Sequence, residues 1–92
     1  MTPEIEILRK KIDSIEDKLI ALLNERAEYV LEIGKIKRKQ DLPVTDSKRE
    51  EEILNRIVQK NPGPISNEFM KAIFEKIIEE SVKMEIQGPG NG

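Results

Sequence analysis

The chain has 92 residues, enough for one small domain, and its 16 basic and 18 acidic side chains give a net charge of -2. This near balance provides no overall attraction to nucleic acid or to an anionic membrane. The sequence contains neither cysteine nor histidine, which excludes disulfides, zinc or haem ligation through these residues, and hydrolytic triads. An enzyme built from this chain must act through arginine, lysine, carboxylates and hydroxyl groups.

The sequence shows no membrane or secretion signal. It has no run of about 18 apolar residues that would span a bilayer, and the N-terminus lacks the apolar region of a signal peptide. We therefore expect a cytoplasmic location.

The first predicted helix is very long. Thr2 and Pro3 are suited to the N-cap and N1 positions, and nothing except Gly34 weakens the helix before about Gln40. Its apolar residues alternate in steps of three and four, which is typical of a coiled-coil seam: Ile5, Leu8, Ile12, Ile15, Leu19 and Leu22.

Two shorter helices follow. The second is predicted from about Ser47 to Gln59, and the third begins after Ser66 as N-cap. The third helix should bury one stripe: Phe69, Met70, Ile73, Phe74, Ile77 and Ile78. We predict an all-α fold with one domain over residues 1–87 and a disordered tail over residues 88–92.

The length of the first helix predicts a partner. At about 1.5 Å per residue it extends roughly 55 Å, whereas a compact globule of this chain length has a radius of gyration of only about 12 Å. Two shorter helices cannot cover its whole apolar stripe. We therefore expect an obligate homodimer.

Each predicted helix carries polar residues on its apolar face. Arg26 continues the seam of the first helix, and Lys37 lies eleven residues on, about 20° around the helix. Glu50 on the second helix also turns inward, although it could instead form a capping box with Ser47. On the third helix, Ser81 and Glu85 occupy inward positions.

Each of these residues has an ordinary structural explanation when taken alone. Arg26 could extend its charge to solvent, Lys37 could stabilise a helix C-terminus, and Ser81 could bond to its own helix. Glu85 could be solvated near a helix end. Five inward polar groups in so short a chain nevertheless predict a polar pocket. Because its first-helix wall is cationic, the expected ligand is an anion.

The order and spacing of these residues resemble the all-helical class of chorismate mutase. The resemblance extends from about Ile5 to Glu85 and includes "LRKKIDSIEDKLIALLNERAEYVLEIGKIK", "LPVTDSKREEEIL" and "IFEKIIEESV". The residues that match the family's motifs are Arg9, Arg26, Lys37, Asp46, Arg49, Glu50 and Ser81.

This resemblance implies an intertwined antiparallel homodimer of three-helix protomers. It implies the Claisen rearrangement of chorismate to prephenate, in phenylalanine and tyrosine biosynthesis, without cofactor or metal. By resemblance, Arg9 and Arg26 bind carboxylates of the substrate, and Lys37 reaches its ether oxygen and a carboxylate. Glu50 and the backbone around Asp46 bind the ring hydroxyl. Arg49 supports the site and Ser81 contacts a carboxylate.

Glu85 departs from the commonest family pattern, which has glutamine at this position. An ionised carboxylate accepts hydrogen bonds only, so Glu85 would donate to the ether oxygen only when protonated. We therefore expect activity to fall as Glu85 ionises. We assign the catalytic roles to Lys37, Glu85, Arg26 and Arg9.

If Arg9 and Arg26 serve the same site, Arg9 must come from an antiparallel partner, as the resemblance implies. Arg9 and Arg26 are seventeen residues apart, about 25 Å along one straight helix, so one protomer cannot direct both to one small ligand. Gly34, which costs up to about 1 kcal/mol inside a helix, indicates either a close approach by ligand or a neighbouring helix, or merely tolerant packing.

Two other functions fit parts of the pattern. An isochorismate-pyruvate lyase of the same fold uses a similar cationic pocket. A non-catalytic helical dimerisation or regulatory module would account for the helices, but it has no need of inward Arg26, Lys37 and Ser81.

Overall fold

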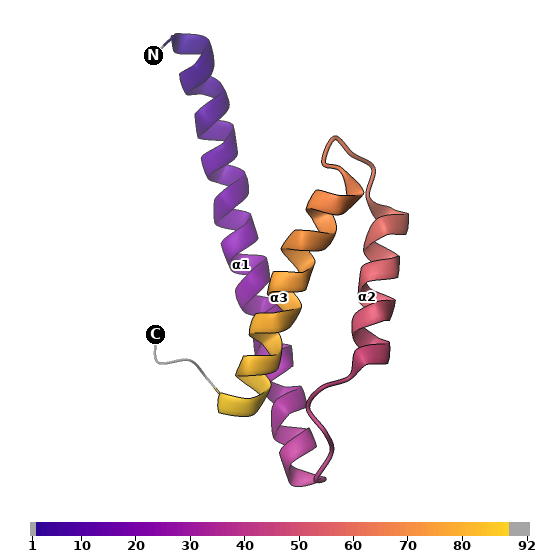
Figure 1. Ribbon diagram of the computed structural model, residues 1–92. Coiled ribbons are helices and arrows are strands. Elements are labelled where there is room, and N and C mark those ends of the chain that lie inside the picture. Colours follow the sequence, from indigo (N-terminus) through magenta and orange to yellow (C-terminus); the bar gives the residue numbers. More distant parts are fainter. Residues whose placement is uncertain (1, 89–92) are drawn as a thin grey trace.

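The computed structural model describes residues 2–88, which form three helices (Figure 1). These are α1 (Pro3–Lys39), α2 (Ser47–Lys60) and α3 (Asn67–Gln87). Every regular element in this part of the chain is a helix, so the all-α prediction is confirmed. Of the predicted tail, residues 88–92, only Gly88 lies within the described residues, where it is the C-cap of α3.

A side chain caps the start of each helix. Thr2, Asp46 and Ser66 each accept a hydrogen bond from a backbone N–H in the first turn of α1, α2 and α3, respectively. Because Asp46 takes the N-cap position, Ser47 is already the first residue of α2. The possible capping box between Ser47 and Glu50 is therefore wrong, and Glu50 is free to turn inward.

Helix α3 lies between the other two helices. It packs against both α1 and α2, and α1 and α2 have no close backbone contact with each other within residues 2–88. Only the C-terminal half of α1 crosses α3; the N-terminal half diverges from α3, and its first turns extend past the loop between α2 and α3 (Figure 1). The chain is 56 Å long and its radius of gyration is 16.5 Å, well above the value of about 12 Å for a compact chain of this length.

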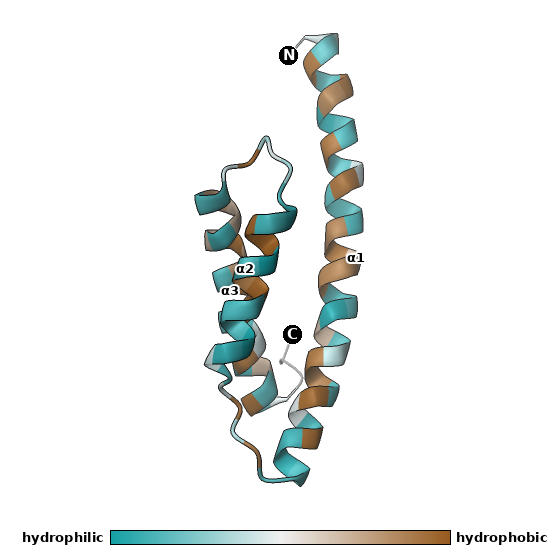
Figure 2. Cartoon of the chain, turned by 90° about the vertical axis from the view of Figure 1, so that its right-hand side faces the viewer, coloured by the Kyte–Doolittle hydropathy of each residue, from teal (hydrophilic) through white to brown (hydrophobic). Residues whose placement is uncertain are grey.

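The extended half of α1 leaves its apolar seam uncovered. Figure 2 shows hydrophobic residues along the length of α1, including its first turns, which extend past the loop between α2 and α3. The six seam residues from Ile5 to Leu22 are between 40% and 62% exposed. In α3, Phe69 and Ile73 of the predicted buried stripe are also exposed, so the prediction that the protomer buries them is wrong. The buried apolar side chains are those of Val30, Ile53 and Ile78.

Helices α1 and α3 approach closely at Gly34. A Cβ atom built on Gly34 would lie 2.9 Å from the Cα atom and 3.0 Å from the carbonyl oxygen of Glu85. The close approach anticipated at Gly34 is thus made by a neighbouring helix. No helix of residues 2–88 has the length and apolarity needed to cross a membrane.

Candidate active site

The three helices surround a cavity of about 400 Å³, a volume within the range of small-molecule sites. Helix α1 and helix α3 form two walls, and the start of α2 with the preceding loop forms the third. Seven of the eight predicted site residues line this cavity: Arg26, Lys37, Asp46, Arg49, Glu50, Ser81 and Glu85. The inward faces that helical periodicity assigned to Arg26, Lys37, Glu50, Ser81 and Glu85 therefore converge, and Asp46 and Arg49, implied by the resemblance, lie at the same cavity.

Arg9 is the predicted site residue that the protomer does not bring to the cavity. It lies in the N-terminal part of α1 and its Nη1 is 3.3 Å from Glu6 Oε1, in an ion pair whose side chains are about half exposed. Arg26 is seventeen residues further along the same straight helix. The structure of one protomer therefore agrees with the expectation that Arg9 and Arg26 cannot share one site in cis.

Arg26 is held against α3 by Ser81. Its Nη1 donates a hydrogen bond of 2.5 Å to Ser81 Oγ, and Ser81 Oγ in turn donates to the carbonyl oxygen of Ile77 at 2.7 Å. Ser81 is buried, and its hydroxyl proton is already used within α3. In this arrangement Ser81 orients the guanidinium, a role that the sequence did not indicate. Contact between its hydroxyl and a ligand would require the proton to leave Ile77.

The environment of Arg26 favours an incoming anion. Burial of its guanidinium, followed by the nearby cations Arg49 and Arg56, lowers the pKa of Arg26 from its ordinary value, and Glu85 acts in the opposite direction. Arginine remains charged even so. A partly desolvated cation beside two others is stabilised when a carboxylate enters. Arg56 was not among the predicted site residues, because its position on α2 gives no periodicity signal for the cavity.

Lys37 links α1 to both other walls. Its Nζ lies 2.7 Å from Glu85 Oε1 and donates a hydrogen bond of 2.9 Å to the carbonyl oxygen of Val44. Glu85 Oε1 is buried, and within residues 2–88 its contact is this ion pair and no hydrogen bond. An ammonium group carries three donors, which leaves Lys37 with capacity for a ligand.

The start of α2 contributes three charged residues to the cavity: its N-cap Asp46, and Arg49 and Glu50 in its first turn. Asp46 Oδ1 accepts from the backbone N–H of Arg49 at 3.0 Å, so its carboxylate serves the helix start. The Arg49 guanidinium is exposed and lies 3.6 Å from Glu52. Glu50 is half-buried and lines the cavity, as its inward assignment predicted. Together with Arg26, Lys37 and Glu85 from the other two helices, these residues give the cavity wall of one protomer three cations and three carboxylates.

The rest of the cavity wall is mainly apolar. Its remaining lining residues are Tyr29, Val30, Ile33, Val44, Ile53, Ile78 and Val82. Apolar side chains around a bound molecule lower the local dielectric constant and strengthen electrostatic interactions, but Tyr29 and Ile33 are exposed in one protomer, so the cavity there is open to solvent. The cavity is thus suited to a compact, partly apolar ligand that carries negative charge.

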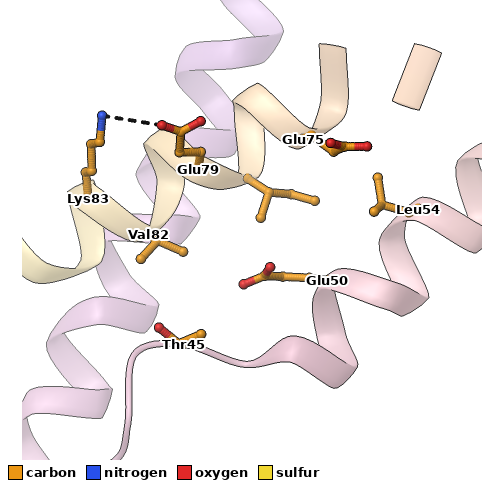
Figure 3. A pocket seen from close by; sticks show the side chains of 8 residues that line it. Thr45, Glu50, Leu54, Glu75, Glu79, Val82 and Lys83 are labelled. Carbon is orange, nitrogen blue, oxygen red and sulfur yellow. Dashed lines mark ion pairs between the residues drawn. The ribbon is translucent and has the colours of Figure 1, made fainter. Parts of the chain in front are cut away.

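A second cavity, of about 510 Å³, shares Glu50 with the first but differs in its electrostatics (Figure 3). It lies between α2 and α3, and its other charged residues are Glu75, Glu79 and Lys83. Lys83 is 3.8 Å from Glu79 and so is already paired. Three carboxylates and one paired cation disfavour an anionic ligand. The smaller cavity beside α1 is therefore the candidate active site.

Comparisons with known proteins agree with this geometry. The bifunctional chorismate mutase/prephenate dehydratase of Aquifex aeolicus is 36% identical, over 94% of this chain and 26% of that protein. This chain therefore spans about a quarter of the length of that curated relative. Among solved structures, chorismate mutase (form II) of Thermus thermophilus has a TM-score of 0.91 and 36% identity, with 95% of this chain and 99% of that chain covered.

A solved structure that contains prephenate is also similar. Chorismate mutase from Helicobacter pylori, solved in complex with prephenate, has a TM-score of 0.84 and 32% identity, and 92% of each chain is covered. The sequence profile of the family described as chorismate mutase type II matches residues 8–86, most of the helical domain. The chain therefore belongs to the chorismate mutase type II family.

Proposed function

We propose that this chain catalyses the rearrangement of chorismate to prephenate. The observation that carries the proposal is the convergence of Arg26, Lys37 and Glu85 on one cavity in a member of this family. The similar Helicobacter pylori enzyme, which was solved with prephenate, supports the same substrate class. Prephenate leads to phenylalanine and tyrosine, so the proposed role is in aromatic amino-acid biosynthesis.

The residue types match the chemistry of this reaction. A Claisen rearrangement is an intramolecular exchange of bonds, in which a carbon–oxygen bond breaks as a carbon–carbon bond forms, so neither a nucleophile nor a net proton transfer is required. Catalysis then consists of holding the substrate in its folded conformer and stabilising charge on the ether oxygen. Arg26 provides a guanidinium for a carboxylate, and the remaining donor capacity of Lys37 is placed for the ether oxygen.

Glu85 is the proposed second donor to the ether oxygen. Within the described part of the protomer, its Oε1 is buried beside Lys37 and has no hydrogen-bond partner. A protonated carboxyl would donate to the substrate oxygen, whereas an ionised carboxylate would repel the negative charge that develops there. The role of Glu85 therefore depends on its protonation state in the complex.

We also propose that the functional form is a homodimer in which Arg9 acts on the partner's cavity. The six seam residues of α1 are about half exposed in one protomer. Completing their burial would contribute on the order of 5 kcal/mol per protomer, comparable with the whole stability of a small domain. The cavity in one protomer has as many carboxylates as cations, so a dianion also benefits from a fourth cation. Arg9, on the uncovered half of α1, is suited to supply it.

The proposed activity is tested by following the loss of chorismate absorbance with the purified chain. Arg26→Ala should lower kcat/KM by about 10²-fold or more, since it removes a charged donor from the site. Lys35→Ala, which removes an exposed cation from the same helix, is the matched control and should behave like the parent. A folded parent that does not consume chorismate would refute the proposal, and release of pyruvate from isochorismate instead would identify a lyase.

The proposed assembly is tested separately by sedimentation or light scattering at micromolar concentration. A dimer is expected, because a monomer exposes the seam from Ile5 to Leu22. A stable, folded and active monomer would rule out the trans role of Arg9.

A further inference from the structure

Arg38 lies outside the cavity but contacts a residue that lines it. Its guanidinium Nη1 donates a hydrogen bond to the backbone carbonyl oxygen of Glu85. Arg38 itself is not part of the cavity lining. The two residues are 47 positions apart in sequence, so this bond connects the end of α1 to the last turn of α3.

The carbonyl of Glu85 is available because α3 ends two residues later, at Gln87. The last four carbonyls of a helix have no partner within the helix. The backbone N–H of Gly88 bonds to Met84, and α3 has no basic residue in its own last turn. A cation near a helix C-terminus is stabilised by the helix dipole. Arg38 therefore supplies both a donor and a positive charge that α3 lacks.

One turn of α1 contacts Glu85 in three ways. Gly34 has no side chain, which lets the Cα atom and carbonyl of Glu85 approach α1. Lys37 pairs with the carboxylate at 2.7 Å, and Arg38 binds the carbonyl. The backbone of Glu85 is thus fixed from one side, while its side chain points to Lys37. Without Arg38, the contact with Lys37 would depend on a helix end, and helix ends fray.

We propose that Arg38 is a positioning residue, which holds the last turn of α3 against α1 so that the carboxyl group of Glu85 stays in the cavity beside Lys37. The consequence for catalysis rests on the proposed function, because Glu85 must act on the substrate. The positioning itself does not rest on that function, since it concerns the side-chain conformation of Glu85.

The kinetic test compares Arg38→Leu with Lys39→Leu. Each variant removes one exposed cation from the last turn of α1, but only Arg38 contacts Glu85. Arg38→Leu should lower kcat about 10-fold with KM within about 2-fold, because misplacement of a catalytic group mainly slows the chemical step. Arg38→Lys, which retains a cationic donor, should recover part of the loss. Lys39→Leu should match the parent.

A double-mutant cycle tests whether Arg38 acts through Glu85. In a Glu85→Ala background, Arg38→Leu should cause no further loss of kcat, because the group that it positions is absent. An equal loss in both backgrounds, or an unchanged kcat for Arg38→Leu, would overturn the catalytic part of the proposal.

A measurement without substrate separates this inference from the proposed function. Three-bond coupling constants from NMR should show one χ1 rotamer for Glu85 in the parent and in Lys39→Leu, but averaging between rotamers in Arg38→Leu. Arg38→Gln, which is shorter and uncharged, serves if Arg38→Leu does not fold. A single rotamer in every variant would overturn the positioning role. If the parent is inactive on chorismate but the rotamers average as expected, the proposed function fails and the positioning role stands.

Discussion

The tight crossing at Gly34 gives a prediction whose magnitude follows from the structure. In Gly34→Ala the new Cβ would lie 2.9 Å from the Cα atom of Glu85, whereas carbon atoms in contact are separated by about 3.5–4.0 Å. Helix α3 must therefore move away by at least roughly 0.6 Å. The guanidinium of Arg38, 3.3 Å from the new atom, is the end of a flexible side chain and can move more easily.

Two opposing effects decide the stability of Gly34→Ala. Alanine is favoured over glycine inside a helix by up to about 1 kcal/mol, but overpacking typically costs about 1–3 kcal/mol. We expect a net destabilisation of up to about 2 kcal/mol. Activity should be affected more strongly than stability, because the shift of α3 would move Glu85 away from Lys37 on α1. Since a misplacement of about 1 Å can cost up to about 10²-fold, we expect kcat to fall by about 10-fold or more.

Denaturant unfolding and chorismate consumption measure these two effects separately. Lys35→Ala is the matched control, because it places alanine at the neighbouring, exposed position of the same helix. This variant should retain the stability and kcat of the parent. If Gly34→Ala were more stable than the parent by about the full helix-propensity gain, with unchanged kcat, the crossing would not be as tight as the structure indicates.

Three further outcomes are expected. Glu85→Gln, which has a permanent amide donor, should flatten the fall of kcat with rising pH, whereas parallel pH profiles would mean that Glu85 is not the ether-oxygen donor. An equal mixture of Arg9→Ala and Arg26→Ala, after subunit exchange, should recover about a quarter of parental activity, because half of the dimers then contain one intact site; no recovery despite exchange would exclude a trans role for Arg9. A hydrogen bond from exposed Lys76 is the largest cause that lowers the pKa of Glu80. When folding lowers the pKa of a carboxyl group, the resulting stabilisation is fully present above the ordinary pKa of that group. It disappears as the pH falls through the lowered pKa. Denaturant titrations should therefore show Glu80→Gln to be less stable than the parent at neutral pH, and equal to it well below about pH 4; a deficit that persists in acid would refute this assignment.

Periodicity alone was sufficient to predict much of the fold. The starts of α1 and α3 follow from local residues, since Thr2 and Ser66 cap helices where a short polar side chain precedes an apolar stripe. The start of α2 shows the limit of this reasoning. Asp46 and Ser47 are both good N-cap residues, and the choice depends on the path of the preceding loop. That path is tied down by the hydrogen bond from Lys37 to Val44, a contact that local sequence does not specify.

The candidate site was predictable where one helix face decides a position. Arg26, Lys37, Ser81 and Glu85 were assigned to apolar faces, and these faces meet in one cavity. The partners of these residues were not predictable. The bond between Arg26 and Ser81 depends on how α1 and α3 cross. The bond from Arg38 ends on a backbone carbonyl, which every residue possesses and which therefore leaves no pattern in the sequence.

The charges in the cavity connect the proposed assembly with the proposed chemistry. One protomer lines the cavity with three cations and three carboxylates, which offers no surplus charge to a dianion. Arg9 from a partner protomer would raise the cations to four, and a proton on Glu85 would reduce the ionised carboxylates to two. The resulting difference of two positive charges matches the two negative charges of chorismate. In the proposed dimer, Arg9 from the partner and a proton on Glu85 would thus act in the same electrostatic direction. For the same reason, Glu85→Gln, which removes the carboxylate charge permanently, should raise the net positive charge of the cavity.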